Sequence, residues 1–168
     1  MPDKYFVKNI GVVDASGTEL VDFLNRMSTN DFQKFKENEF RKTILTSDKG
    51  RIIDVITLLN SANRKIILTT AGFEQKVISH LGKYIIMDDV VLENSKDAYI
   101  HFFISGENSF QKIQSIYKIE NDVIEKNLFF ETANGEIIFK ENINIESVNI
   151  ICKKENSDKI KILLNDFD

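Results

Sequence analysis

The segment from Leu45 to Asp54 constrains the fold most, because it is typical of two β-strands joined by a tight turn. Apolar and β-branched residues stand on both sides of the polar residues Ser47–Gly50. Glycine, aspartate and serine are residues that tight turns favour. A strand that returns at once through such a turn pairs antiparallel with its predecessor. The chain therefore contains at least one antiparallel sheet.

The same alternation of strands and helices continues along the chain. Apolar residues at helical spacing, such as Leu20, Phe23, Leu24 and Met27, predict helices over about 18–27, 73–83, 107–118 and 157–166. Strands are predicted over about 40–46, 51–59, 64–70, 89–94, 98–105, 128–132, 136–140 and 146–153. The pair Asn134-Gly135 is a strong hairpin signal. Together these patterns predict an α+β fold with mainly antiparallel sheets, packed helices and duplicated ferredoxin-like units.

Length and composition favour one globular body. A chain of 168 residues suits a single domain, with two similar halves over about 1–95 and 96–168 as a possible subdivision. The apolar fraction of 42% and the charged fraction of 29% are ordinary for a water-soluble protein. The net charge of −4 argues against a general affinity for nucleic acid or for acidic membranes.

Targeting signals and cysteine content favour the cytoplasm. No apolar run follows the N-terminus as in a signal peptide, and none approaches the roughly 20 residues of a membrane helix. Cys152 is the only cysteine, so no internal disulfide is possible, which fits a reducing compartment. We therefore expect a cytoplasmic protein without nucleic-acid or membrane partners.

Three segments in order resemble the first half of one family, over roughly residues 10 to 95. They are Asp14–Gly17 with Phe23-Leu24 and Ser28–Asp31, then Leu45–Asp54, and finally Leu81–Val90. The family is the folate-binding family of the glycine-cleavage T-protein and its iron–sulfur-assembly relatives. The resemblance implies tetrahydrofolate or a related reduced folate as ligand.

The hairpin strand bears on catalysis. In the T-protein branch the turn is followed by two apolar residues and two aspartates, and the second aspartate is catalytic. Here Asp54 matches the first aspartate, and Val55 stands at the catalytic position. Aminomethyl transfer is therefore not expected, and the basic residue Arg51 after the turn glycine resembles the accessory branch instead.

The candidate folate-binding residues follow from this resemblance. Arg51 offers a planar fork for a carboxylate, and a buried Asp54 would need a hydrogen-bonding partner. The string Asn30-Asp31 and the pair Lys83-Tyr84 match family segments. Each also has a plain structural interpretation, since Asn and Asp form turns and lysine suits a helix C-terminus.

Other polar residues carry little chemistry. Two histidines, His80 and His101, and one cysteine give almost no support for a zinc site. We expect both histidines to be packed or surface residues, with His80 on the polar side of its helix, and Cys152 to be half-buried in a strand. The pair Asp88-Asp89 is expected to form a turn that opens the next strand.

The function implied by the resemblance is a tetrahydrofolate-binding accessory protein that supports iron–sulfur cluster assembly or repair. The Lys-Gly-Cys and Gly-Gln-Glu strings of that branch are absent, so we expect a fragment or a short paralogue. One alternative is an aminomethyltransferase-like enzyme of one-carbon metabolism, and another is a module of this fold that only binds proteins. Because the family's C-terminal region is missing, we expect a homodimer that covers the exposed apolar face.

Overall fold

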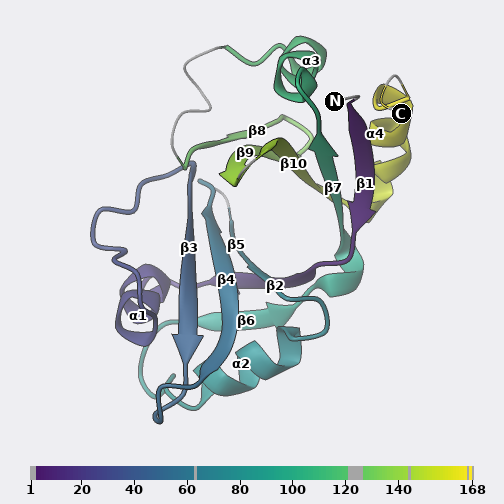
Figure 1. Ribbon diagram of the computed structural model, residues 1–168. Coiled ribbons are helices and arrows are strands. Elements are labelled where there is room, and N and C mark those ends of the chain that lie inside the picture. The colour runs from purple at the N-terminus through teal and green to yellow at the C-terminus, as the bar shows by residue number, and fades with distance from the viewer. Residues whose placement is uncertain (1–2, 63, 121–126, 144, 166, 168) are drawn as a thin grey trace. The chain divides into compact units, whose positions relative to one another are not determined.

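Two five-stranded antiparallel sheets dominate the computed structural model, which describes residues 3–62, 64–120, 127–143, 145–165 and 167. The chain divides into two units (Figure 1). Unit 2 comprises residues 10–96, and unit 1 comprises residues 1–9 together with 97–168. The first nine residues thus group with the later part of the chain.

In unit 2 a strand or group of strands is followed by a helix twice along the chain. Its elements are β2 (Gly11–Ser16), α1 (Leu20–Met27), β3 (Glu39–Thr46), β4 (Ile52–Asn60), β5 (Lys65–Thr69), α2 (Glu74–Gly82) and β6 (Val91–Asn94). The strand order is β3-β4-β5-β2-β6, and every neighbouring pair is antiparallel.

Unit 1 contains the remaining elements. They are β1 (Lys4–Lys8), β7 (Tyr99–Ser105), α3 (Ser109–Tyr117), β8 (Phe129–Glu131), β9 (Ile137–Ile143), β10 (Ile145–Lys153) and α4 (Ser157–Leu163). Short 3-10 turns cover Lys96–Ala98 and Lys154–Asn156. The strand order is β1-β7-β10-β9-β8, again antiparallel throughout.

The two units share one topology. In unit 2 the chain runs strand, helix, three strands, helix, strand, and unit 1 repeats this order from β7 onward with β1 supplying the last strand. Both sheets also have the same spatial order, because β3-β4-β5-β2-β6 corresponds to β8-β9-β10-β7-β1. The expected duplication is therefore visible in the arrangement of the elements.

Each sheet packs its own helices on one face. In unit 2, Phe23 and Leu24 of α1 and Leu81 of α2 are fully buried in a core with Ile56 and Leu58 of β4. In unit 1 a second core joins side chains of β7, β9 and β10 with Ile113 of α3 and Ile160 of α4. The buried residues of the helices recur three and four positions apart, so each helix turns one apolar face to the core.

The predicted α+β class with mainly antiparallel sheets is confirmed. All four predicted helices are present, and the predicted strands lie within a few residues of those observed. Residue 166, the predicted end of the last helix, lies outside the described residues. Two strands, β1 and β2, were not predicted. None of the helices in the described ranges is long and apolar enough to cross a membrane.

Candidate functional site

The β3–β4 turn has the geometry that its sequence predicts. Gly50 adopts a φ of 70°, a left-handed conformation that glycine tolerates best. Ser47 closes the turn, because its N–H donates to the Arg51 carbonyl at 2.8 Å and its carbonyl accepts from the Gly50 N–H at 2.9 Å. The Arg51 N–H donates in turn to Ser47 Oγ at 3.2 Å. The Arg51 side chain is left exposed just past the turn.

Adjacent residues of β4 have opposite environments. Asp54 is only 5% exposed, whereas Val55 is 51% exposed. Successive side chains of a strand point to opposite faces of the sheet. The carboxylate of Asp54 and the side chain of Val55 therefore lie on opposite faces of the unit 2 sheet.

The Asp54 carboxylate connects β4 to the turn between β5 and α2. Its Oδ2 accepts from the Thr70 N–H at 2.9 Å, and its Oδ1 accepts from the Thr70 hydroxyl at 2.7 Å. Oδ1 also accepts from the Val55 N–H at 2.9 Å. Three hydrogen bonds supply the partners that a buried carboxylate requires. Asp54 thus acts within the fold as a clamp on the segment that leads into α2.

Further contacts hold α2 against β4 from the same end. Glu74, which is 3% exposed, accepts a hydrogen bond from the Gly72 N–H at 3.0 Å. Lys76 donates to the Ile53 carbonyl at 3.0 Å and lies over the Phe73 ring at 4.1 Å. The chain's own carboxylates therefore occupy the start of α2, where positive helix-dipole charge favours them.

The opposite end of α2 lies beside the β3–β4 turn. His80 hydrogen-bonds the Thr46 backbone and lies near the charges of Asp48 and Lys83. The His80 ring meets the Tyr84 ring edge-on, with centroids 5.5 Å apart. Burial, together with the positive charge of Lys83, lowers the pKa of His80. Its Nε2 is buried without a hydrogen-bond partner.

His80 is only 7% exposed, so of the two expected environments, packed or at the surface, the structure shows the packed one. The end of β3 and the turn that follows it lie beside this face of α2, since His80 hydrogen-bonds the Thr46 backbone and lies near Asp48. Helical spacing could not reveal this contact, since that turn lies some thirty residues earlier. Lys83 itself is exposed, and Tyr84 is 41% exposed.

Asn30 and Asp31 lie along the outer edge of β3. The Asn30 side chain donates to the Lys42 carbonyl at 2.7 Å, and its N–H donates to Thr43 Oγ1 at 3.0 Å. Asn30 Oδ1 accepts from the Asp31 N–H at 2.9 Å, and Asp31 Oδ1 accepts from the Gln33 N–H at 2.7 Å. The contact between Asp31 and Gln33 is the side-chain-to-backbone turn that aspartate commonly forms.

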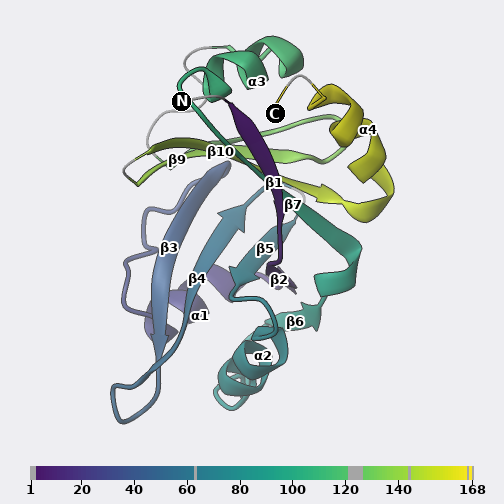
Figure 2. The same cartoon turned by 45° about the vertical axis from the view of Figure 1, so that its right-hand side comes forward.

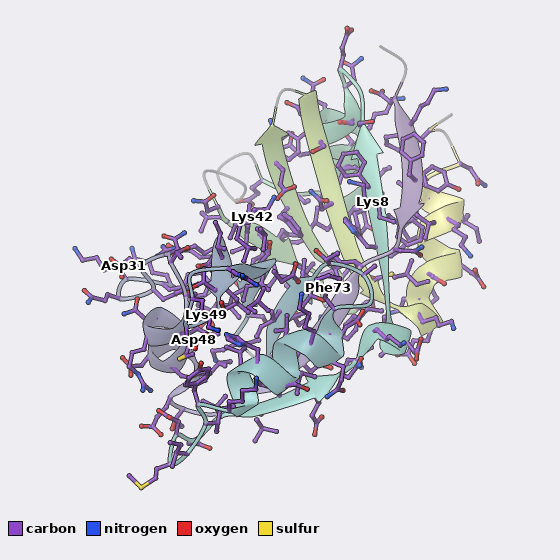
Figure 3. All side chains as sticks on the ribbon, turned by 60° about the horizontal axis from the view of Figure 1, so that its bottom comes forward. Lys8, Asp31, Lys42, Asp48, Lys49 and Phe73 are labelled. Carbon is purple, nitrogen blue, oxygen red and sulfur yellow. The ribbon has the colours of Figure 1, made fainter. Side chains whose placement is uncertain are left out.

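The six candidate residues therefore lie at three places in unit 2. Arg51, Lys83 and Tyr84 belong to the turn and the adjoining end of α2, while the Asp54 carboxylate points to the start of α2. Asn30 bonds the edge of β3, and Asp31 follows it in the loop. Figure 3 shows Asp48 and Lys49 together at the turn, with Asp31 apart from them.

Two further carboxylates have structural roles. Asp89 accepts hydrogen bonds from the Thr18 N–H and hydroxyl, both at 2.8 Å, which lower its pKa and hold the segment before α1. Asp88 forms an ion pair with Arg26 of α1 and accepts the Val90 N–H through its carbonyl at 2.9 Å. The pair forms the turn before β6, as predicted.

The histidine and the cysteine of unit 1 are both buried. His101 Nε2 lies 2.8 Å from Asn149 Oδ1, and burial lowers the pKa of His101 to about 4. Burial raises the pKa of Cys152 to about 12, so the thiol stays protonated at neutral pH. Cys152 is 0% exposed, and the expectation that it is half-buried is therefore wrong. The described residues contain no group of three metal-ligating side chains.

A groove among the described residues of unit 1 is lined by none of the six candidate residues. Its volume is about 380 Å³, and it runs between α3 and Phe167. The lining residues are Asn108, Gln111, Lys112, Ser115, Ile116 and Phe167. Lys112 is already paired with Asp3 at 2.9 Å, so the groove offers no uncompensated charge from that residue.

Known proteins are similar to this chain in sequence and in fold. Aminomethyltransferases of Exiguobacterium sibiricum and Staphylococcus carnosus are 26% and 27% identical over 133 and 146 residues. These matches cover 78% and 86% of this chain, but only 36% and 37% of the relatives. The chain thus spans less than half the length of the curated relatives it matches.

Solved structures confirm the fold. The glycine cleavage system aminomethyltransferase T from Bartonella henselae matches 98% of this chain and 46% of its own, with a TM-score of 0.83 at 16% identity. A chain of the heterotetrameric sarcosine oxidase from Corynebacterium sp. U-96 matches 98% of this chain, with a TM-score of 0.69 at 7% identity. The family model described as the GCVT N-terminal domain matches residues 6–142. The chain therefore belongs to the GCVT N-terminal domain family.

Proposed function

We propose that this chain binds a reduced folate, with tetrahydrofolate as the ligand, and does not transfer an aminomethyl group. Family membership and the relatives named as aminomethyltransferases support folate as the ligand class. The observation that carries the second half of the proposal is the pair Asp54 and Val55. The one carboxylate of this strand is bound to Thr70, and the neighbouring exposed position holds a valine.

The chemistry of aminomethyl transfer requires more than this strand supplies. A general acid or base typically contributes a factor of about 10²–10⁴ to a rate. Valine can neither accept a proton nor orient a folate nitrogen. Asp54 cannot replace the missing group, because its carboxylate is turned to the other face and holds Thr70. An aminomethyltransferase-like enzyme remains the alternative that measurement must decide.

The accessory branch supplies the cellular role in this proposal. We place the chain in the support of iron–sulfur cluster assembly or repair, in the cytoplasm and as a homodimer. The exposed Arg51 after the turn glycine supports this branch, because the resemblance in this turn is to the accessory proteins. Iron–sulfur assembly proteins would then be its partners.

A thermal-shift titration with tetrahydrofolate tests the ligand. Ligand at a hundredfold excess over its dissociation constant stabilises a protein by about 2.7 kcal/mol. For a chain of this size the melting temperature should rise by about 5–10 °C. A melting temperature that stays constant up to millimolar tetrahydrofolate would contradict the proposal.

Arg51 and Lys49 provide a matched pair of variants. Both are exposed cations of the same turn, but only Arg51 is proposed to bind the carboxylate of the folate glutamate. Arg51→Ala should weaken binding about tenfold or more, since a charged hydrogen bond contributes about 1.5–3 kcal/mol. Lys49→Ala should leave the dissociation constant unchanged. If the two substitutions weakened binding equally, Arg51 would act only through its positive charge and would not bind the carboxylate specifically.

Methylene transfer to tetrahydrofolate tests the absence of transferase activity. The wild-type chain should show no turnover above the uncatalysed rate. Turnover at an ordinary enzyme rate, about 1 s⁻¹ or faster, would establish the alternative. Folate binding and transfer are separate readouts, so either half of the proposal can fail alone.

A further inference from the structure

The edge strands of the two sheets are protected to different degrees. In unit 2 the outer edge of β3 is covered, because Ser28 bridges Leu45 and the Thr29 N–H donates to the Ile44 carbonyl at 3.2 Å. The opposite edge, β6, has four residues and includes a charged one, Glu93. In unit 1 the edge strand β8 has three residues. Short and charged edges are ways in which proteins prevent strand addition.

β1, the other edge of the unit 1 sheet, differs from these three. It pairs with β7 on one side, and the strand order ends there (Figure 2). Its sequence is Lys-Tyr-Phe-Val-Lys, and four of its five residues are exposed. Phe6 is 52% exposed and Val7 is 53% exposed, although they point to opposite faces of the sheet. An exposed apolar edge strand is a template for pairing with another strand.

We propose that β1 is a docking edge for an extended segment of another protein, in which apolar residues are flanked by carboxylates. Main-chain hydrogen bonds to β1 would supply affinity, as in other strand-addition complexes. Side chains opposite Phe6 and Val7 would be apolar. A carboxylate at the end would face Lys4, which is exposed and forms no ion pair among the described residues. This surface goes beyond the folate proposal and does not depend on it.

A second copy of the chain fits this edge less well. Antiparallel self-pairing centred on Phe6 places Lys4 opposite Lys8 at both ends, and like charges directly opposite each other destabilise a strand pair. Charge complementarity therefore selects a segment with acidic ends.

The probe is a short fluorescent peptide with alternating valine and threonine residues between two glutamates. Two control peptides replace the glutamates by lysines or place a proline at the centre. Fluorescence anisotropy with the full chain should show tighter binding of the acidic peptide than of either control. Hydrogen exchange in the complex should show added protection of backbone amides within residues 4–8.

Charge reversal distinguishes docking at β1 from non-specific binding of the peptide. Lys4→Glu should weaken binding of the acidic peptide and strengthen binding of the lysine peptide, each by up to about fivefold, because a cross-strand charge pair contributes up to about 1 kcal/mol. Val7→Lys should abolish binding of the acidic peptide. The matched control is Val91→Lys, which changes an equally exposed valine on β6 and should have no effect.

Three results would overturn the proposal. The first is equal binding of the acidic and proline-containing peptides. The second is binding of the acidic peptide that Lys4→Glu leaves unchanged. This test does not depend on whether Val7→Lys folds. The third is a concentration-dependent dimer in sedimentation that Val7→Lys abolishes, since β1 would then be occupied by a second copy.

Discussion

Removal of the Asp54 carboxylate should destabilise the fold rather than only a binding site. Asp54→Ala deletes the acceptor of three hydrogen bonds, two of them from Thr70. A hydrogen bond to a charged group contributes about 1.5–3 kcal/mol, but Thr70 is exposed and water can replace part of the loss. We therefore expect the free energy of unfolding to fall by about 2–4 kcal/mol, a large part of the stability of an ordinary domain.

Urea denaturation of unliganded protein measures this loss. Asp48→Ala is the matched control, because Asp48 is an exposed carboxylate in the turn of the same hairpin and should change stability by less than about 0.5 kcal/mol. Asp54→Asn adds a second test. The amide can accept through one oxygen only, so one of the bonds from Thr70 is lost and the variant should be intermediate.

Hydrogen exchange places the effect in the structure. The Thr70 amide should exchange faster in Asp54→Ala, since its hydrogen bond to Oδ2 is gone. The reasoning fails if Asp54→Ala has wild-type stability and loses only the thermal shift with tetrahydrofolate. Asp54 would then be a ligand-binding residue held in place by other contacts.

Two further predictions concern single residues. Because burial lowers the pKa of His101 to about 4 from 6.5, the unfolded chain binds the extra proton between these pH values, and stability present at pH 7 is lost as the pH falls from about 6.5 toward 4. Between pH 7 and pH 5 the free energy of unfolding of the wild-type chain should fall by about 2 kcal/mol more than that of His101→Gln, a variant that keeps a hydrogen bond to Asn149. Urea denaturation at the two pH values measures both losses, and equal losses would refute a buried neutral imidazole. Gly17→Ala should destabilise by more than about 2 kcal/mol, because Gly17 has a φ of 114° and a Cβ there would lie 1.9 Å from the Asp89 carbonyl oxygen. Gly82→Ala, in a helix with open space around it, should instead stabilise by about 0.5–1 kcal/mol, and melting curves that rank the two variants in the opposite order would contradict this reasoning.

Local patterns predicted most of the secondary structure because the signals are local. The turns at Ser47–Gly50 and Asn134-Gly135 formed as expected, with left-handed glycines in both. β2 was missed, since Gly11 at its start and Asp14 within it are poor strand formers. Its position between β5 and β6 buries Val12 and Val13 completely, and this tertiary packing overrides the weak local preference.

The candidate site was harder to predict, because its contacts join distant parts of the chain. The sequence indicated that Asp54 needs a partner, but Thr70 lies sixteen positions later and becomes its neighbour only when β5 pairs with β4. His80 lies beside a turn from another part of the chain. Asp31 shows the opposite case, since its hydrogen bond from the Gln33 N–H is the local turn contact that an aspartate commonly makes.

The hairpin therefore carries two kinds of information in neighbouring positions. Asp54 holds the start of α2, so any chain with this fold and this clamp needs an acid there, whatever its activity. Val55 is half exposed on the other face, where the fold requires little of the side chain. Loss of an acid at that position would remove chemistry at almost no cost in stability, because a solvated surface substitution usually changes stability by less than about 0.5 kcal/mol. The contacts of Asp54 within the fold thus account for an acid at that position, and in the proposed function the exposed position beside it distinguishes this chain from a transferase.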